Sequence, residues 1–110
     1  MGKDGLGEFE LLVLLACLRL GPDQAYAVAI VNEIRERTTR EIHRAAVYVT
    51  LQRLEDKGLI TTRLGESLPE RGGKARRLVT LQPAGRVAVR DSRAAFQRMW
   101  LGLGRQLEEQ

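Results

Sequence analysis

The sequence predicts a mainly helical protein with one small β-hairpin. Two helical patterns, separated by a glycine-proline break, precede the stretch AAVYVTLQRLEDKGLI at 45–60, whose apolar residues keep helical spacing for three turns. Two strand-like runs at 59–64 and 76–81 flank a segment rich in glycine, proline and charge. A last apolar pattern follows Pro83. The expected order is therefore three helices, a hairpin and a final helix.

Composition is typical of a single soluble domain. The chain has 110 residues, of which 44% are hydrophobic and 29% charged. Its one cysteine, Cys17, excludes an internal disulfide and lies in the apolar run LLVLLACLRL, so we expect a buried thiol and a reducing cytoplasm. The apolar run at 11–20 is too short to cross a membrane and follows Glu8 and Glu10 instead of a basic leader, which predicts a core helix.

The first two helices are predicted at 8–20 and 25–38. The first carries acids at its start and Arg19 at its end, as the helix dipole favours. The segment 21–23, Gly-Pro-Asp, ends it. The second has an inward stripe of Ile30, Val31 and Ile34.

The third helix has two contrasting faces. Val47, Leu51 and Leu54 fall within about 60° on a helical wheel and form its buried side. Gly58 ends the helix where a left-handed residue is commonly needed. The opposite side consists of small and polar residues: Ala45, Val49, Gln52 and Asp56, with Ala46 and Arg53 beside them.

The last helix is predicted from Pro83 to Glu108, since proline suits a first helical turn. Gly102 and Gly104 weaken it as an isolated helix. Its apolar stripe consists of Val89, Phe96, Met99, Trp100, Leu103 and Leu107. Three helices followed by a hairpin is the element order of a winged helix-turn-helix, so we assign residues 1–82 to this fold. Residues 83–110 are assigned to a C-terminal dimerisation helix of the same structural unit.

Positive charge is concentrated in the middle of the chain. Residues 35–80 carry eleven basic and six acidic side chains, whereas residues 1–34 carry two basic and five acidic ones. This asymmetry indicates an anionic partner, although a basic surface without a partner would show it too.

A DNA-binding role follows from the outward face of the third helix and the basic hairpin. Gln52 suits an adenine edge, and Arg53 a guanine edge or a phosphate. Ala45, Ala46 and Val49 allow close approach to the bases. The predicted phosphate contacts are Arg44, Tyr48 and Lys57 on the helix and Arg71, Lys74, Arg76 and Arg77 in the hairpin.

Each of these features also has a simpler interpretation. Gln52 and Arg53 alone could form a solvated helix face, and the ring of Tyr48 could pack against the hairpin. On adjacent elements of a winged helix they favour double-stranded DNA. The alternative function is a winged-helix module that binds protein without specific DNA binding.

The last helix carries more large apolar side chains than a compact domain of this size covers, which predicts a homodimer. Trp100, the only tryptophan, lies within that stripe. Two copies of Trp100 facing each other, with Met99 and Phe96 nearby, would frame a pocket for a planar hydrophobic effector. Alternatively, Trp100 only fills the interface. The sequence leaves both open.

The sequence argues against an enzyme. It has one histidine, His43, and no group of Cys or His with metal-ligand spacing, so no metal site or cofactor is expected. The glycine pair at 72–73 lies within the hairpin and not between a strand and a helix, where a phosphate-binding loop would require it. His43 at a helix start is expected to be a surface or capping residue.

The sequence also resembles the PadR-like transcriptional regulators, in the short form with a single C-terminal helix. The matching residues are Ala45, Val47, Tyr48, Leu51, Arg53-Leu54-Glu55, Gly58-Leu59-Ile60, Gly72 to Arg77, Pro83 and Gly85, with the segments GEFELLVLLACLRLG and AYAVAI. The resemblance implies a cytoplasmic, homodimeric DNA-binding regulator. Such proteins are usually repressors released by a small molecule or another signal.

Overall fold

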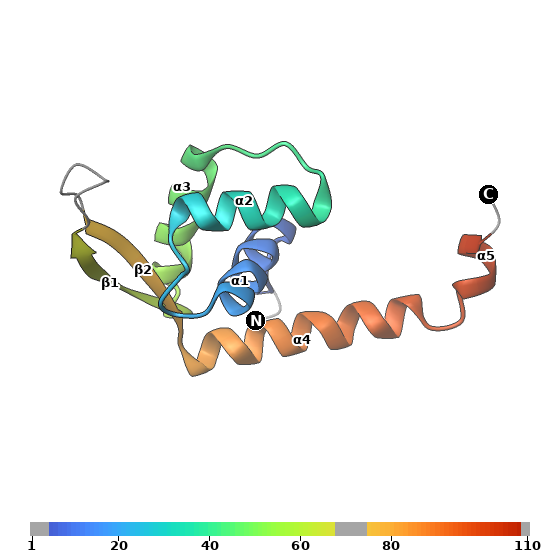
Figure 1. Ribbon diagram of the computed structural model, residues 1–110. Coiled ribbons are helices and arrows are strands. Elements are labelled where there is room, and N and C mark those ends of the chain that lie inside the picture. Colours follow the sequence, from blue (N-terminus) through green and yellow to red (C-terminus); the bar gives the residue numbers. More distant parts are fainter. Residues whose placement is uncertain (1–4, 68–74, 109–110) are drawn as a thin grey trace.

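The computed structural model describes residues 5–67 and 75–108 (Figure 1). Its elements follow the order predicted from the sequence, three helices, a two-stranded hairpin and a final helical segment. They are α1 (Glu8–Leu20), α2 (Ala27–Thr38), α3 (Arg44–Asp56), β1 (Ile60–Ser67), β2 (Ala75–Leu81), α4 (Pro83–Trp100) and α5 (Gly104–Glu108). The fold is a winged helix-turn-helix followed by a C-terminal helix.

Helix α1 lies at the centre of the molecule and has the predicted bounds. Val13 and Leu14 are fully buried among α2, α3 and β2. Cys17 is also buried, as expected, and burial raises the pKa of its thiol to about 12. Because the thiolate is the reactive form of cysteine, Cys17 is an inert part of the core.

Helix α2 begins at Ala27, two residues later than the predicted start at 25. Tyr26, which precedes the first turn, has an extended backbone with φ −132° and ψ 165°. The carbonyl of Ala25 accepts a hydrogen bond of 2.9 Å from the N–H of Val79 in β2. This contact with the hairpin holds the chain extended at 25–26, and no local pattern in the sequence reveals it.

Helix α3 has the predicted buried side of Val47, Leu51 and Leu54. Thr50 is buried beside them, which the apolar pattern did not indicate. Gly58 ends the segment with φ +77°, in the left-handed region predicted for it. The opposite side of α3 is consequently left at the surface.

Strands β1 and β2 form an antiparallel hairpin, the wing, in which Ile60 pairs with Leu81 and Leu64 with Arg77. The wing is longer than the predicted runs at 59–64 and 76–81, since pairing continues past an irregularity after Leu64 to Ser67 and Ala75. The glycine and charged residues beyond Leu64 gave no strand pattern, although backbone pairing extends through them. The wing therefore stands as a ribbon beside α3.

The predicted continuous helix 83–108 is wrong at its C-terminal end, because α4 stops at Trp100. Leu101 has ψ 127° and Gly102 has φ +86°, so the chain leaves the helix before the short α5 begins. Glycine is a weak helix former, and residues 101–108 are all exposed, so little burial of apolar surface compensates for it. Leu103 and Leu107 consequently do not continue the stripe of α4.

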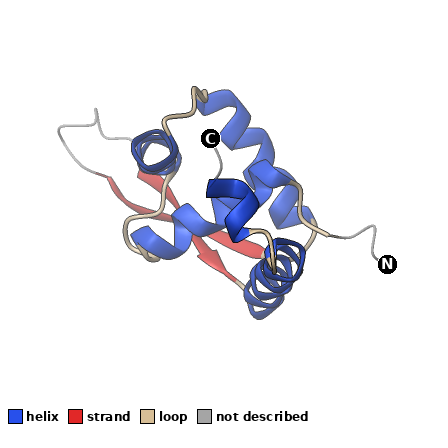
Figure 2. Ribbon diagram, turned by 90° about the vertical axis from the view of Figure 1, so that its right-hand side faces the viewer, coloured by secondary structure: helices blue, strands red, loops and turns tan. Residues whose placement is uncertain are grey.

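Helix α4 packs against α1 with its N-terminal half, while its C-terminal half and α5 extend beyond the other helices (Figure 1). Figure 2, turned by 90°, shows α4 nearly end-on beside the helical cluster. Val89 packs against the core, but Phe96, Met99 and Trp100 are exposed.

Candidate nucleic-acid interface

The outward face of α3 is open to solvent along its whole length. The five residues predicted to approach DNA bases, Ala45, Ala46, Val49, Gln52 and Arg53, are all exposed. Val49, the one large apolar side chain among them, is 57% exposed. The buried stripe leaves this face without a partner within the described chain.

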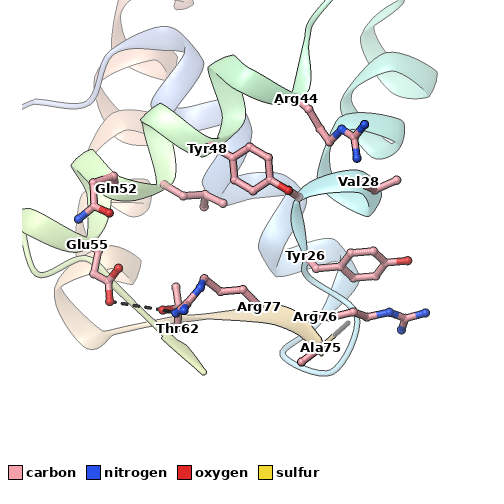
Figure 3. A pocket seen from close by; sticks show the side chains of 12 residues that line it. Tyr26, Val28, Arg44, Tyr48, Gln52, Glu55, Thr62, Ala75, Arg76 and Arg77 are labelled. Atoms are coloured by element: carbon pink, nitrogen blue, oxygen red, sulfur yellow. Dashed lines mark hydrogen bonds between the residues drawn. The ribbon is translucent and has the colours of Figure 1, made fainter. Parts of the chain in front are cut away.

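A groove of about 380 Å³ separates α3 from the wing (Figure 3). Arg44 and Tyr48 line it from α3, and Arg76 and Arg77 line it from β2. Tyr48 lines this groove with a side chain that is 55% exposed. The groove thus brings together four of the predicted phosphate contacts, which lie far apart in the sequence.

The start of α2 closes the same groove on a third side. The guanidinium carbon of Arg76 lies 4.5 Å from the centre of the Tyr26 ring, a cation–π contact (Figure 3). Tyr26 was not among the predicted site residues. Its sequence neighbours are apolar, and its role depends on a contact across fifty residues of chain, so no local signal marks it.

A chain of hydrogen bonds joins the wing to α3 at the other end of the groove. Arg77 Nη1 donates to Thr62 Oγ1 at 2.8 Å, and the Thr62 hydroxyl donates to Glu55 Oε2 at 3.4 Å (Figure 3). Thr62 and Glu55 were also missed by the sequence analysis. They hold the Arg77 guanidinium at the groove instead of leaving it free in solution.

Lys57 is placed differently from the other predicted contacts. Its ammonium donates to both carboxylate oxygens of Glu10, at 2.9 and 3.2 Å, and so joins the end of α3 to the start of α1. Burial of Glu10 raises the pKa of its carboxyl, but hydrogen bonds from the Gly7 N–H and from Lys57 outweigh that effect and lower the pKa below its usual value. Lys57 is therefore engaged in an ion pair that secures α3.

Two predicted contacts, Arg71 and Lys74, lie outside the described residues. His43 occupies the position before α3 that caps the helix, but its side chain makes no capping hydrogen bond. Within 5–67 and 75–108, no three His, Cys, Asp or Glu side chains are grouped as metal ligands. In the same ranges, none of the helices combines the length and apolar character of a membrane span.

An exposed helix with small and polar residues, next to a wing whose Arg76 and Arg77 line the same groove, defines the class of winged-helix DNA-binding proteins. The family model of the transcriptional regulator PadR-like family matches residues 14–91, which is most of the chain. The protein therefore belongs to the PadR-like family, and it is a DNA-binding transcriptional regulator, not an enzyme.

Solved structures with this fold come from bacteria and archaea. A PadR family transcription regulator from Clostridium difficile R20291 is 19% identical, with a TM-score of 0.72 over 92% of this chain and 99% of that one. A PadR family transcriptional regulator from Eggerthella lenta is 25% identical, with a TM-score of 0.68 over 94% of this chain and 88% of that one. A putative transcriptional regulator from Thermoplasma acidophilum is 15% identical, with a TM-score of 0.69 over 91% of this chain and 93% of that one. A comparison with curated proteins finds no match.

Proposed function

We propose that the protein is a cytoplasmic, homodimeric repressor that binds an inverted-repeat operator in double-stranded DNA and is released by a small molecule or another signal. The observation that carries the DNA-binding part is the basic groove between α3 and the wing, beside an exposed helix face. Two such faces in a symmetric dimer would meet DNA about one helical turn apart, roughly 34 Å.

The side chains divide into two roles in this proposal. Gln52 and Arg53 on the outward face of α3 read base edges, and Ala45, Ala46 and Val49 let the helix enter the major groove. Arg44, Tyr48, Arg76 and Arg77 hold phosphates on either side of the groove, and Tyr26 supports Arg76. Lys57 acts at the end of α3 through the ion pair with Glu10, and Arg71 and Lys74 are assigned to phosphates from the sequence alone.

Replacing Arg53 by alanine is expected to weaken binding to the preferred operator by about 1–3 kcal/mol, because a base contact is lost. The effect on random duplex should be small. Replacing Arg76 and Arg77 by glutamine should instead weaken all duplexes alike and flatten the dependence of affinity on salt. The measurement is a titration of fluorescent duplexes at several salt concentrations, after selection of the operator from a random library.

Equal losses for operator and random duplex in the Arg53→Ala variant would make Arg53 a phosphate contact. If the unchanged protein bound no duplex selectively, the alternative of a protein-binding winged-helix module would be favoured. Val87 is exposed on α4 and does not line the groove between α3 and the wing, so Val87→Ala is the control for nonspecific effects of substitution.

The proposed dimer rests on an apolar groove of about 580 Å³ between α1 and α4. Leu15 and Leu18 line it from α1, Phe96 and Trp100 line it from α4, and all four are exposed in the single chain. Met99, Leu103 and Leu107, exposed on the projecting C-terminal segment, extend the apolar surface. A second copy of the chain would cover these side chains, with α1 of the partner as the second surface.

A planar hydrophobic effector would bind beside Trp100 in this interface. The rings of Phe96 and Trp100 lie 5.9 Å apart at 54°, and Trp100 is 60% exposed, so an aromatic surface is available. Such a compound should quench the fluorescence of this single tryptophan and lower operator affinity in parallel, by changing the angle between the two α4 helices. Quenching without a change in DNA affinity, or no quenching, would leave Trp100 as interface packing.

A further inference from the structure

A carboxylate lies on the face of α3 that is proposed to meet DNA. Asp56 is exposed there, one helical turn after Gln52, and accepts a hydrogen bond of 3.1 Å from Gln52 Nε2. A negative charge at this position repels phosphates, so on electrostatic grounds alone Asp56 weakens binding. Its contact with Gln52 indicates what it contributes in return.

The contact determines how the Gln52 amide is oriented. An ionised carboxylate only accepts hydrogen bonds, so the amide must turn its nitrogen, and not its oxygen, toward Asp56. One of the two N–H groups of Nε2 is then engaged. The second N–H and the carbonyl oxygen remain, which gives Gln52 one free donor and one free acceptor in a defined arrangement.

That remaining pair matches one base. Adenine presents an acceptor, N7, and a donor, the N6 amino group, in the major groove, whereas guanine presents two acceptors, N7 and O6. An amide nitrogen with both hydrogens free could serve the two acceptors of guanine. With one hydrogen held by Asp56 it cannot, and the amide oxygen would face guanine O6.

We propose that Asp56 is a positioning residue that orients the Gln52 amide and thereby makes α3 select adenine over guanine at one operator position. This inference rests on the proposed DNA-binding function. Asp56 acts through Gln52 and itself touches no base. Holding the amide in its binding orientation also reduces the conformational freedom that Gln52 would lose on binding.

The test uses the full chain and the operator selected from a random duplex library. The operator position read by Gln52 is the one at which Gln52→Ala loses its preference among bases. Affinity is then measured for duplexes with adenine or guanine at that position, and for random duplex. The proteins are the unchanged chain, Asp56→Ala, Asp56→Asn, Gln52→Ala and the Gln52→Ala/Asp56→Ala double variant.

Asp56→Ala is expected to lower the preference for adenine over guanine by about tenfold, the discrimination typical of one bidentate base contact, while binding to random duplex stays equal or strengthens. Asp56→Asn should also lose much of the preference, because its side-chain amide can donate to the Gln52 oxygen as well as accept from Nε2, and so no longer imposes one orientation on Gln52. In the Gln52→Ala/Asp56→Ala double variant, the preference for adenine over guanine should equal that of Gln52→Ala alone, because Asp56 acts only through Gln52. Asp91→Ala, which removes an exposed carboxylate from α4, is the control for charge.

Two results would overturn the inference. One is an equal gain in affinity for all duplexes in Asp56→Ala and Asp56→Asn with an unchanged preference, which would make Asp56 a source of repulsion only. The other is a Gln52→Ala variant that keeps the full base preference at every position. Failure of the unchanged protein to select any duplex would instead contradict the proposed function itself, so the two failures are distinguishable.

Discussion

Replacing Gly85 by alanine is expected to lower the free energy of unfolding by about 3 kcal/mol, the upper end for overpacking of a core. Gly85 is buried in the first turn of α4, and an added Cβ would lie 2.3 Å from the carbonyl oxygen of Leu59. That oxygen belongs to the backbone and already accepts the N–H of Gln82 at 2.8 Å. The start of α4 would have to move away from Leu59 and would lose part of its contact with β2.

Gly104→Ala is the matched control, because nothing lies within 4 Å of its added Cβ and alanine favours the helix. Urea denaturation of both variants, at the same protein concentration, measures the difference. Two variants within about 0.5 kcal/mol of each other, the range of ordinary surface substitutions, would contradict the close approach of α4 to Leu59.

Introducing glutamate at both Leu15 and Phe96 is expected to produce monomers and to weaken binding to the inverted repeat by about 10²–10⁴-fold, the usual gain from bivalency. Both side chains line the groove between α1 and α4 and are exposed, at 38% and 49%, so the folded monomer tolerates the charge. Two desolvated carboxylates per chain are incompatible with an apolar interface.

The oligomeric state is measured by sedimentation at micromolar concentration, and DNA binding with full operators and single half-sites. Val87→Glu is the control, since Val87 is an exposed aliphatic residue on the opposite side of the same helix. Half-site affinity should persist in the double variant. A protein that remains dimeric, or that loses half-site binding to the same extent as operator binding, would contradict the proposed interface.

Local pattern was sufficient to predict most of the architecture. The bounds of α1 and the start of α4 at Pro83 follow from helical periodicity and from residues that begin or end helices. In α3, the buried side predicted by Val47, Leu51 and Leu54 is confirmed. The exposed face therefore follows by exclusion. The hydrogen bond between Gln52 and Asp56, which share that face one turn apart, was not predicted, although their spacing permits it.

Tertiary contacts decided the remaining features. The late start of α2 depends on a hydrogen bond from Val79 to Ala25, and the place of Tyr26 in the groove depends on Arg76. The end of α4 was mispredicted because an apolar stripe indicates a helix only where something packs on it, and α4 projects beyond the other helices before Gly102.

The sequence by itself determined the winged-helix order and the side chains that face outward from α3, since both depend on interactions within one element. Only the tertiary structure decided which distant residues share the groove. It placed Tyr26 beside Arg76, and it directed Lys57, a predicted phosphate contact, to Glu10, which lies 47 residues away. The physical reason is that an exposed charged side chain takes whichever partner the fold brings within reach, and neither periodicity nor composition records that partner.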